Sequence, residues 1–232
     1  MRYIKRFTVA ERLHHIILFV TFMVLSFTGW PLKYPEVSYS KWWINLWGGP
    51  QSAQLIHRIA GVTMVLGFLW HVVYVANNIL KRRYRMSIVT TIIPTPKDIT
   101  DFIQNVLYMV GISKEKPKFG RFSYLHKFDY WAVFWGMGFI GLTGLMMTFP
   151  VQFSYIIPDF AKEWIWDLCF YLHSDEALLA VVFIYSFHFF NEHLRGHKFP
   201  MNTVFLTGEV PEEEYKEEFP LEYELMKKEG EI

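Results

Sequence analysis

The hydrophobic residues of the chain fall into four long stretches, separated by polar segments that carry most of the charges. These stretches cover roughly residues 9–31, 52–80, 122–149 and 161–195. Each supplies the ~20 residues that a helix needs to cross the hydrocarbon core of a bilayer. Because a helix satisfies its own backbone hydrogen bonds, which lipid cannot do, the pattern predicts an all-α fold. We expect an integral membrane four-helix bundle.

Two polar segments lie outside the predicted spans. In the middle loop, "TPKDITDFIQNVLYMVG" predicts a short amphipathic cytoplasmic segment on the membrane surface, with Asp98 capping its first turn. The C-terminal sequence is acidic and favours a solvated, polar tail; a docking segment for a partner subunit is the alternative. We therefore divide the chain into a transmembrane domain, residues 1–200, and an acidic cytoplasmic tail, residues 201–232.

The placement of lysine and arginine predicts the orientation of the bundle, because cytoplasmic loops carry an excess of these residues. The N-terminal arm is basic, and the loop after the second stretch opens with "KRRYR". The loops after the first and third stretches hold only Lys33, Lys41 and Lys162. Both termini and the middle loop are predicted to be cytoplasmic. No small-residue cleavage site follows the first apolar run, so we expect a retained helix rather than a signal peptide.

The composition agrees with a membrane protein that has polar ends. Of 232 residues, 52% are hydrophobic and 19% are charged, which is too apolar for an ordinary soluble domain. A net charge of +1 without a basic, aromatic stripe gives no sign of nucleic-acid binding. Cys169 is the single cysteine, which excludes an internal disulfide, a cysteine-rich zinc site, a cysteine-ligated iron–sulfur cluster and c-type haem attachment within this chain.

Histidines are the unusual feature of the spans. Seven of the nine lie within or at the edges of the apolar stretches: His14, His15, His57, His71, His126, His173 and His188. An ionisable residue inside a membrane is costly and therefore indicates function, the alternative for any single one being a core histidine bonded to a neighbouring helix. The other two, His193 and His197, lie beyond the inner membrane edge and are expected to be solvated.

Four of these histidines form two pairs, one in the second stretch and one in the fourth. His57 and His71 are 14 residues apart, which on an α-helix is about 40° short of four turns and about 21 Å along the axis. His173 and His188 are 15 apart, about 60° past four turns and about 22 Å along the axis. Because both helices run in the same direction, this spacing pairs His57 with His173 near the outer side and His71 with His188 near the inner side.

Facing imidazoles in twos, at two depths, indicate two b-type haems stacked across the bilayer, each held by two neutral histidines. Zinc is the competing metal, but it wants three or four ligands at one depth. A weak internal echo suggests two similar halves: Thr28-Gly29 closes the first stretch and Thr143-Gly144 closes the third. The first histidine of the next pair, His57 or His173, follows the dipeptide at nearly the same sequence distance in both halves.

The chain resembles, over most of its length, the dihaem cytochrome b subunits of membrane-bound formate dehydrogenases and nickel–iron hydrogenases. "ERLHHIILFVTFMVLSFTG" is similar to that family's first helix, "LIHRIAG" to the start of its second, and "LHSDEALLAVVFIYSFHFF" to its fourth. The resemblance implies that His57 and His173 hold one haem and that His15 and His188 hold the other. Spacing favours His71 over His15 for the inner iron, and His15 is then a candidate quinone ligand. Both alternatives remain open.

Other polar residues near the predicted haems are candidates for supporting roles. Arg58 is placed to pair with a propionate of the outer haem, the alternative being an arginine that extends to the interface. A quinone pocket beside the inner haem is expected to draw on several polar residues, each of which has an ordinary interfacial role as its alternative. These candidates are Glu11, His15, Asn77, Arg82 and His126.

These features predict a membrane-embedded dihaem cytochrome b subunit that carries electrons across the bilayer between a quinone pool and a partner redox subunit of a respiratory oxidoreductase complex. The expected cofactors are two b-type haems, with menaquinone or ubiquinone as exchangeable substrate. The expected partner is an iron–sulfur or multihaem c-type subunit, because the sequence shows no motif for substrate chemistry of its own. We expect the protein in a prokaryotic cytoplasmic membrane. A transmembrane haem reductase for ferric iron and a haem-free membrane anchor are the alternatives.

Overall fold

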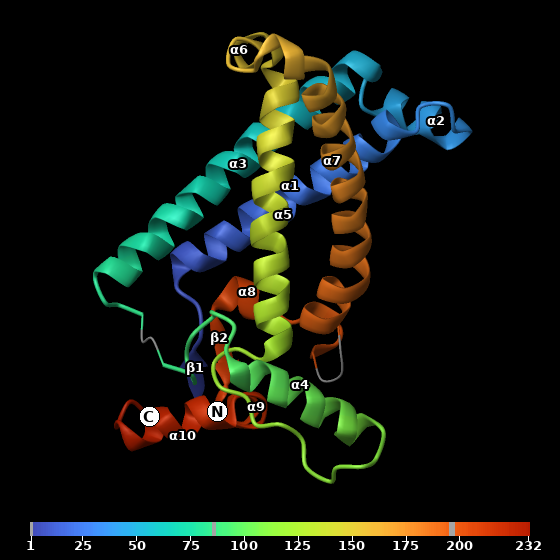
Figure 1. The fold of residues 1–232 in the computed structure, drawn as a ribbon. Helices are drawn as coiled ribbons and strands as arrows, with labels where there is room; N and C mark the ends of the chain where they lie inside the picture. The colour runs from blue at the N-terminus through green and yellow to red at the C-terminus, as the bar shows by residue number, and fades with distance from the viewer. Residues whose placement is uncertain (1, 85–86, 195–197) are drawn as a thin grey trace. The chain divides into compact units, whose positions relative to one another are not determined.

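The computed structural model describes residues 2–84, 87–194 and 198–232. Within these ranges, four helices are long and apolar enough to cross a membrane. They are α1 (Val9–Lys33), α3 (Pro50–Leu80), α5 (Tyr124–Thr148) and α7 (Lys162–Phe183), which continues into the wider π-helical turns of η2 (Ile184–Leu194) (Figure 1). The predicted all-α membrane fold is therefore confirmed, and the helix ends lie within a few residues of the expected ones.

Short elements connect or follow the spans. Three of them begin at a proline, whose fixed φ suits the first helical position. The strands β1 and β2 pair in antiparallel fashion, with Ile4 opposite Val210. The remaining elements of the described residues are β1 (Tyr3–Lys5), α2 (Ser38–Leu46), α4 (Pro96–Met109), α6 (Pro150–Ser154), η1 (Asp159–Ala161), α8 (Val204–Thr207), β2 (Glu209–Pro211), α9 (Glu212–Glu218) and α10 (Pro220–Lys228).

The chain divides into two compact units, each described by itself below. The helical unit comprises Val9–Tyr74 and Val133–Phe205. The terminal unit comprises the residues up to Thr8, Val75–Ala132 and Leu206–Ile232. The domain boundary at residue 200 that the sequence suggests stays a prediction, since the compact units follow contacts and not the order of the chain.

In the helical unit, the protein covers little of its own apolar surface. Among the described residues, at most 17% of the most apolar 18-residue stretch of any spanning helix is buried inside the protein. Large side chains such as Leu66, Val73 and Phe139 are exposed. Polar side chains bond within their own helix, as Thr21 does to the Ile17 carbonyl oxygen at 2.7 Å. Apolar surface of this extent is stable only against lipid or another apolar partner.

The acidic tail is folded. In the terminal unit, β2 pairs with β1 of the N-terminal arm, and Tyr215 is fully enclosed, at 0% exposure. Val210, Phe219 and Glu222 are buried as well. The expectation of a solvated tail is therefore wrong for this part of the chain. The apolar residues between the glutamates form a core, which the charge pattern did not indicate.

Glu222 lies between two arginines from distant parts of the sequence. Arg121 Nη1 donates to Glu222 Oε1 at 2.9 Å, and Arg6 Nη1 lies 3.8 Å from Glu222 Oε2. Each arginine also donates to the backbone carbonyl oxygen of the other at 2.6 Å. Tyr215 donates its hydroxyl to the same carboxylate, and burial raises the pKa of this phenol, so it remains a donor. One carboxylate thus joins the N-terminal arm, the middle loop and the tail.

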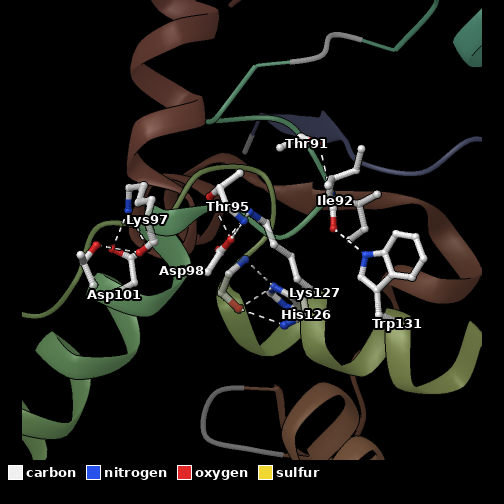
Figure 2. Close-up of polar contacts among 12 residues, drawn as sticks. Thr91, Ile92, Thr95, Lys97, Asp98, Asp101, His126, Lys127 and Trp131 are labelled. Atoms are coloured by element: carbon white, nitrogen blue, oxygen red, sulfur yellow. Dashed lines mark hydrogen bonds and ion pairs between the residues drawn. The ribbon is translucent and has the colours of Figure 1, made fainter. Parts of the chain in front are cut away.

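Figure 2 shows the polar contacts that fix the start of α4 in the terminal unit. The backbone N–H of Thr95 donates to the Asp98 carboxylate at 2.5 Å, so Asp98 caps the helix from its third position. Lys127 Nζ donates to the same carboxylate at 2.9 Å, and Lys97 Nζ donates to Asp101 at 2.6 Å. Burial alone would raise the pKa of Asp98, but the hydrogen bonds from Lys127 and Thr95 outweigh it and hold the pKa below its ordinary value.

The polarity of α4 is inverted relative to that of a helix in a soluble protein. Ile99, Phe102, Ile103 and Val106 are exposed and lie within about 100° of one another around the helix. Asp101, on the other side, is only 7% exposed. The predicted amphipathic segment is therefore present as a helix. Its place on the membrane surface stays a prediction, and an outward apolar face is what that place requires.

We expect Glu222→Gln to release the tail, because the change leaves the buried Arg6 and the half-buried Arg121 without their carboxylate. Breaking a buried ion pair costs about 3–5 kcal/mol. Limited proteolysis of the membrane-bound protein should then cleave the tail faster. Glu224→Gln is the matched control, since Glu224 is exposed. Equal cleavage rates for the two variants would contradict the role of Glu222.

Candidate functional site

The structure brings His57 of α3 and His173 of α7 together inside the helical unit. Their ring centroids are 6.3 Å apart, and the ring planes are inclined at 77°. Each ring is held through Nδ1 by the spanning helix that precedes it in the sequence, His57 by α1 and His173 by α5. Because the hydrogen bonds are made at Nδ1, the Nε2 atoms of both rings remain for another partner.

Thr28 and Gly29 of α1 form the seat of the His57 ring. The Thr28 hydroxyl donates to the Val24 carbonyl oxygen at 2.7 Å, so its oxygen accepts from Nδ1–H of His57 at 2.8 Å. The bond assigns the proton to Nδ1 and leaves the lone pair on Nε2. A Cβ at Gly29 would lie 3.1 Å from Cε1 of the ring. Threonine therefore orients the imidazole, and glycine makes room for it.

The same arrangement recurs on α5. The Thr143 hydroxyl donates to the Phe139 carbonyl oxygen at 2.7 Å, and its oxygen lies 3.3 Å from Nδ1 of His173. Nδ1–H of His173 donates to the Ile140 carbonyl oxygen at 3.0 Å. A Cβ at Gly144 would lie 2.9 Å from Cε1 of this ring. The repeated Thr-Gly dipeptide thus marks two equivalent seats for a histidine.

A second histidine group consists of His15 of α1 with His188 and His193 of η2. The ring centroid of His15 lies 6.2 Å from that of His188 and 5.7 Å from that of His193. The ligand nitrogens of all three lie within 4.8 Å of one another. His193 is only 8% exposed, so the expectation that it is solvated is wrong. His197, expected to be solvated as well, lies outside the described residues.

The π-helical turns of η2 explain why the sequence did not indicate His193. Five residues of an α-helix turn about 500°, which would point His193 about 140° away from His188. In a π-helix the hydrogen bonds run from residue i to residue i+5, so residues five apart lie nearly one above the other. The hydrophobic pattern carries no signal of this wider turn.

His71 lies against His14, outside the second group. Their Nδ1 atoms are 3.5 Å apart, and the His14 ring centroid lies 4.1 Å from a ring of Trp70. The structure brings His15 to His188 and gives His71 a different neighbour. Both histidines of α3 therefore contact α1, His57 at Thr28 and His71 at His14, but among the described residues only His57 also faces a histidine of α7.

The remaining candidates are distributed over both units. Glu11 lies in the helical unit with His15, whereas Asn77, Arg82 and His126 lie in the terminal unit. His126 Nδ1 accepts from the backbone N–H of Ser123 at 3.1 Å. Arg58 is exposed. The quinone pocket and the pairing of Arg58 with a propionate therefore stay predictions.

The residues of both groups fit a b-type haem. A six-coordinate haem takes two neutral imidazoles from facing helices, and the ring separations of His57–His173 and His15–His188 are nearly equal, at 6.3 and 6.2 Å. In the described residues, Nδ1 of His15 and Nδ1 of His193 are buried without a hydrogen-bond partner. An orphaned buried nitrogen is costly, and a bound metal centre offsets that cost.

The bundle and its histidine groups define a membrane cytochrome b. The family model of prokaryotic cytochrome b561 matches residues 6–205, and the chain belongs to this family. It is therefore a prokaryotic membrane protein of electron transport that carries b-type haem.

Curated relatives agree with the family. The cytochrome b556(fdo) subunit of formate dehydrogenase from Escherichia coli strain K12 is 24% identical over 187 residues, which are 78% of this chain and 75% of that one. The same subunit from Escherichia coli O157:H7 matches to the same extent. Heme A synthase from Agrobacterium fabrum is 34% identical over 58 residues, only 22% of this chain and 16% of that one, so this likeness is local.

We expect Thr28→Val to weaken haem binding at His57, because valine removes the acceptor that orients Nδ1–H. Loss of such an outer partner typically lowers metal affinity about 10–100-fold. Haem retention during purification measures the loss. The midpoint potential of one haem should also rise, since His57 becomes a weaker donor. Thr28→Ser keeps the hydroxyl and is the matched control; a valine variant that behaves like the serine variant would rule out this role.

Proposed function

We propose that this chain is a dihaem subunit that carries electrons across the bilayer between a quinone pool and a partner redox subunit of a respiratory oxidoreductase complex. The observation that carries the proposal is that two histidine groups each draw imidazoles from two helices of the helical unit. His57 and His173 hold one haem. His15 and His188 hold the other.

The positions of the ligands along one helix support a path across the membrane. His173 and His188 lie 15 residues apart on α7 and η2, which is about 22 Å along the axis at the α-helical rise and somewhat less through the wider turns of η2. That length is most of a hydrocarbon core of roughly 30 Å. When bound, each haem accepts and passes on single electrons. The protein holds the ligating rings: Thr28 and Thr143 fix two of them, and the glycine beside each lets the ring approach the helix.

A quinone site beside the second haem follows from the polar residues near His15. Glu11 is one turn before His15 on α1. Its carboxylate is close enough to interact electrostatically with both His14 and His71. With His15 on the iron, His71 and Glu11 become the candidates to contact the quinone, which reverses the roles that the spacing favoured. Asn77, Arg82 and His126 remain further candidates. The quinone is menaquinone or ubiquinone.

A partner completes the electron path. The matched relative is a subunit of formate dehydrogenase, and we infer that this chain likewise serves a redox enzyme. The partner is an iron–sulfur or multihaem c-type subunit at the His57–His173 end. With both termini cytoplasmic in a prokaryotic inner membrane, as the basic loops predict, this end faces outward and the quinone site faces the cytoplasm.

Haem content tests the ligands. The purified chain should contain about two b haems by the pyridine haemochrome assay, since each six-coordinate haem takes two of the histidines. His57→Ala and His15→Ala should each remove one haem, whereas His71→Ala should leave both. A chain without haem would exclude the proposal in favour of a membrane anchor. Loss of a haem in His71→Ala, with both retained in His15→Ala, would restore the pairing that the spacing favoured.

Quinone linkage requires its own test. We expect a menaquinol analogue to reduce both haems of the purified protein, because the second haem borders the quinone site. The rate should fall in Glu11→Gln, while dithionite still reduces both haems fully. Leu13→Gln, an exposed position on the same turns of α1, is the matched control. Reoxidation by ferric chelates together with no response to the quinol would instead indicate a ferric reductase.

A further inference from the structure

The second histidine group contains three imidazoles where a six-coordinate haem uses two. His15, His188 and His193 all direct ring nitrogens to one place. Among the described residues, only this group brings three potential metal ligands of its kind together. The first group consists of His57 and His173 alone by the same measure. The additional imidazole is therefore a property of one end of the bundle.

His193 is built into the site. Its ring is buried, and Nδ1 has no hydrogen-bond partner among the described residues. The ring of Phe205 contacts the His193 ring edge-on, with ring centroids 5.0 Å apart, and the ring centroid of Phe189 lies 5.6 Å from that of His193. Aromatic carbon cannot satisfy a lone pair, so the setting favours a metal centre as the partner of this nitrogen.

Asn202 keeps His193 beside His188. The backbone N–H of Asn202 donates to the His193 carbonyl oxygen at 2.9 Å, and its Nδ2 donates to the Glu192 carbonyl oxygen at 2.9 Å. Its Oδ1 accepts from the backbone N–H of Val204 at 3.0 Å. One side chain thus ties the end of η2 to the start of α8. The wide turn that stacks the two histidines is fixed from outside the helix.

We propose that His193 is an alternate axial ligand of the second haem and takes the position opposite His15 when His188 leaves it. This inference rests on the proposed function, since it requires a haem in this group. In the exchange, the Fe–N bond to His188 breaks and an Fe–N bond to His193 forms. One neutral imidazole replaces another, so no electron and no proton is transferred.

The ring separations assign His188 as the resting ligand. His15 and His188 are 6.2 Å apart, close to the 6.3 Å of His57 and His173, whereas His193 lies 5.7 Å from His15. Both candidates project from the same side of η2. Exchange therefore needs a side-chain rotation and a small shift of η2, while α1 and His15 stay in place.

Haem content of the full chain, purified from native membranes, tests the exchange. His188→Ala should keep about two haems per chain, because His193 replaces the lost ligand, and the double variant His188→Ala/His193→Ala should keep about one. Electron paramagnetic resonance should show that both haems of His188→Ala remain low-spin with two imidazoles. His173→Ala is the matched control at the first group and should fall to about one haem.

A second variant separates ligation from folding. Asn202→Ala in the His188→Ala background retains the His193 imidazole but removes the side-chain bonds that hold the end of η2, to the Glu192 carbonyl oxygen and from the Val204 N–H, and it should lose the second haem. Added imidazole should restore that haem to the double variant, which demonstrates a folded site.

Three results would overturn the exchange: the same haem loss in His188→Ala as in the double variant, loss of a haem in His193→Ala alone, or no effect of Asn202→Ala. A wild-type count below two would instead refute the proposed function, so the two failures are distinguishable.

Discussion

An imidazole inside a helix bundle has two nitrogens to satisfy and no water to satisfy them. The helical unit depends on how this requirement is met. At His57 and His173, the protein forms hydrogen bonds to Nδ1, which fixes each ring, and leaves Nε2 available to a metal centre. Threonine serves this purpose inside a span because its hydroxyl proton is donated to its own helix, which leaves the oxygen as an acceptor. The backbone geometry of α1 thereby sets the protonation of a ring on α3.

The two ends of the bundle differ in how firmly they hold their histidine rings. The His57–His173 end has two rings, each with a hydrogen-bonded nitrogen and a glycine beneath it. The other end has three rings, a widened helix and two buried nitrogens without protein partners. In the proposed function, the fixed site is the end that exchanges electrons with a partner subunit, and the adaptable site is the end where the quinone enters and leaves.

Much of this architecture follows from the sequence, because the apolar stretches have the length that a bilayer imposes. His57 and His173 were identifiable since each begins a pair and follows a Thr-Gly dipeptide. His193 was not, because it faces His188 only through the π-helical turns of η2, which the sequence does not signal. His71 as a ligand of the inner haem stays a prediction; the structure places its ring against His14 of α1, a neighbour that the spacing along α3 does not indicate. The folded tail escaped notice because its glutamates outnumber the apolar residues that form its core.

The pairing of β1 with β2 constrains how the protein is made. β1 precedes all the spans, and β2 with Glu222 follows the last of them, yet both strands belong to one compact unit. They can meet only on the same side of the membrane, which requires an even number of crossings between them. Synthesis therefore completes the terminal unit last, after α7 and η2 are in place. A chain in which one span fails to insert holds the two strands on opposite sides of the membrane. Its tail and N-terminal arm then remain without their core.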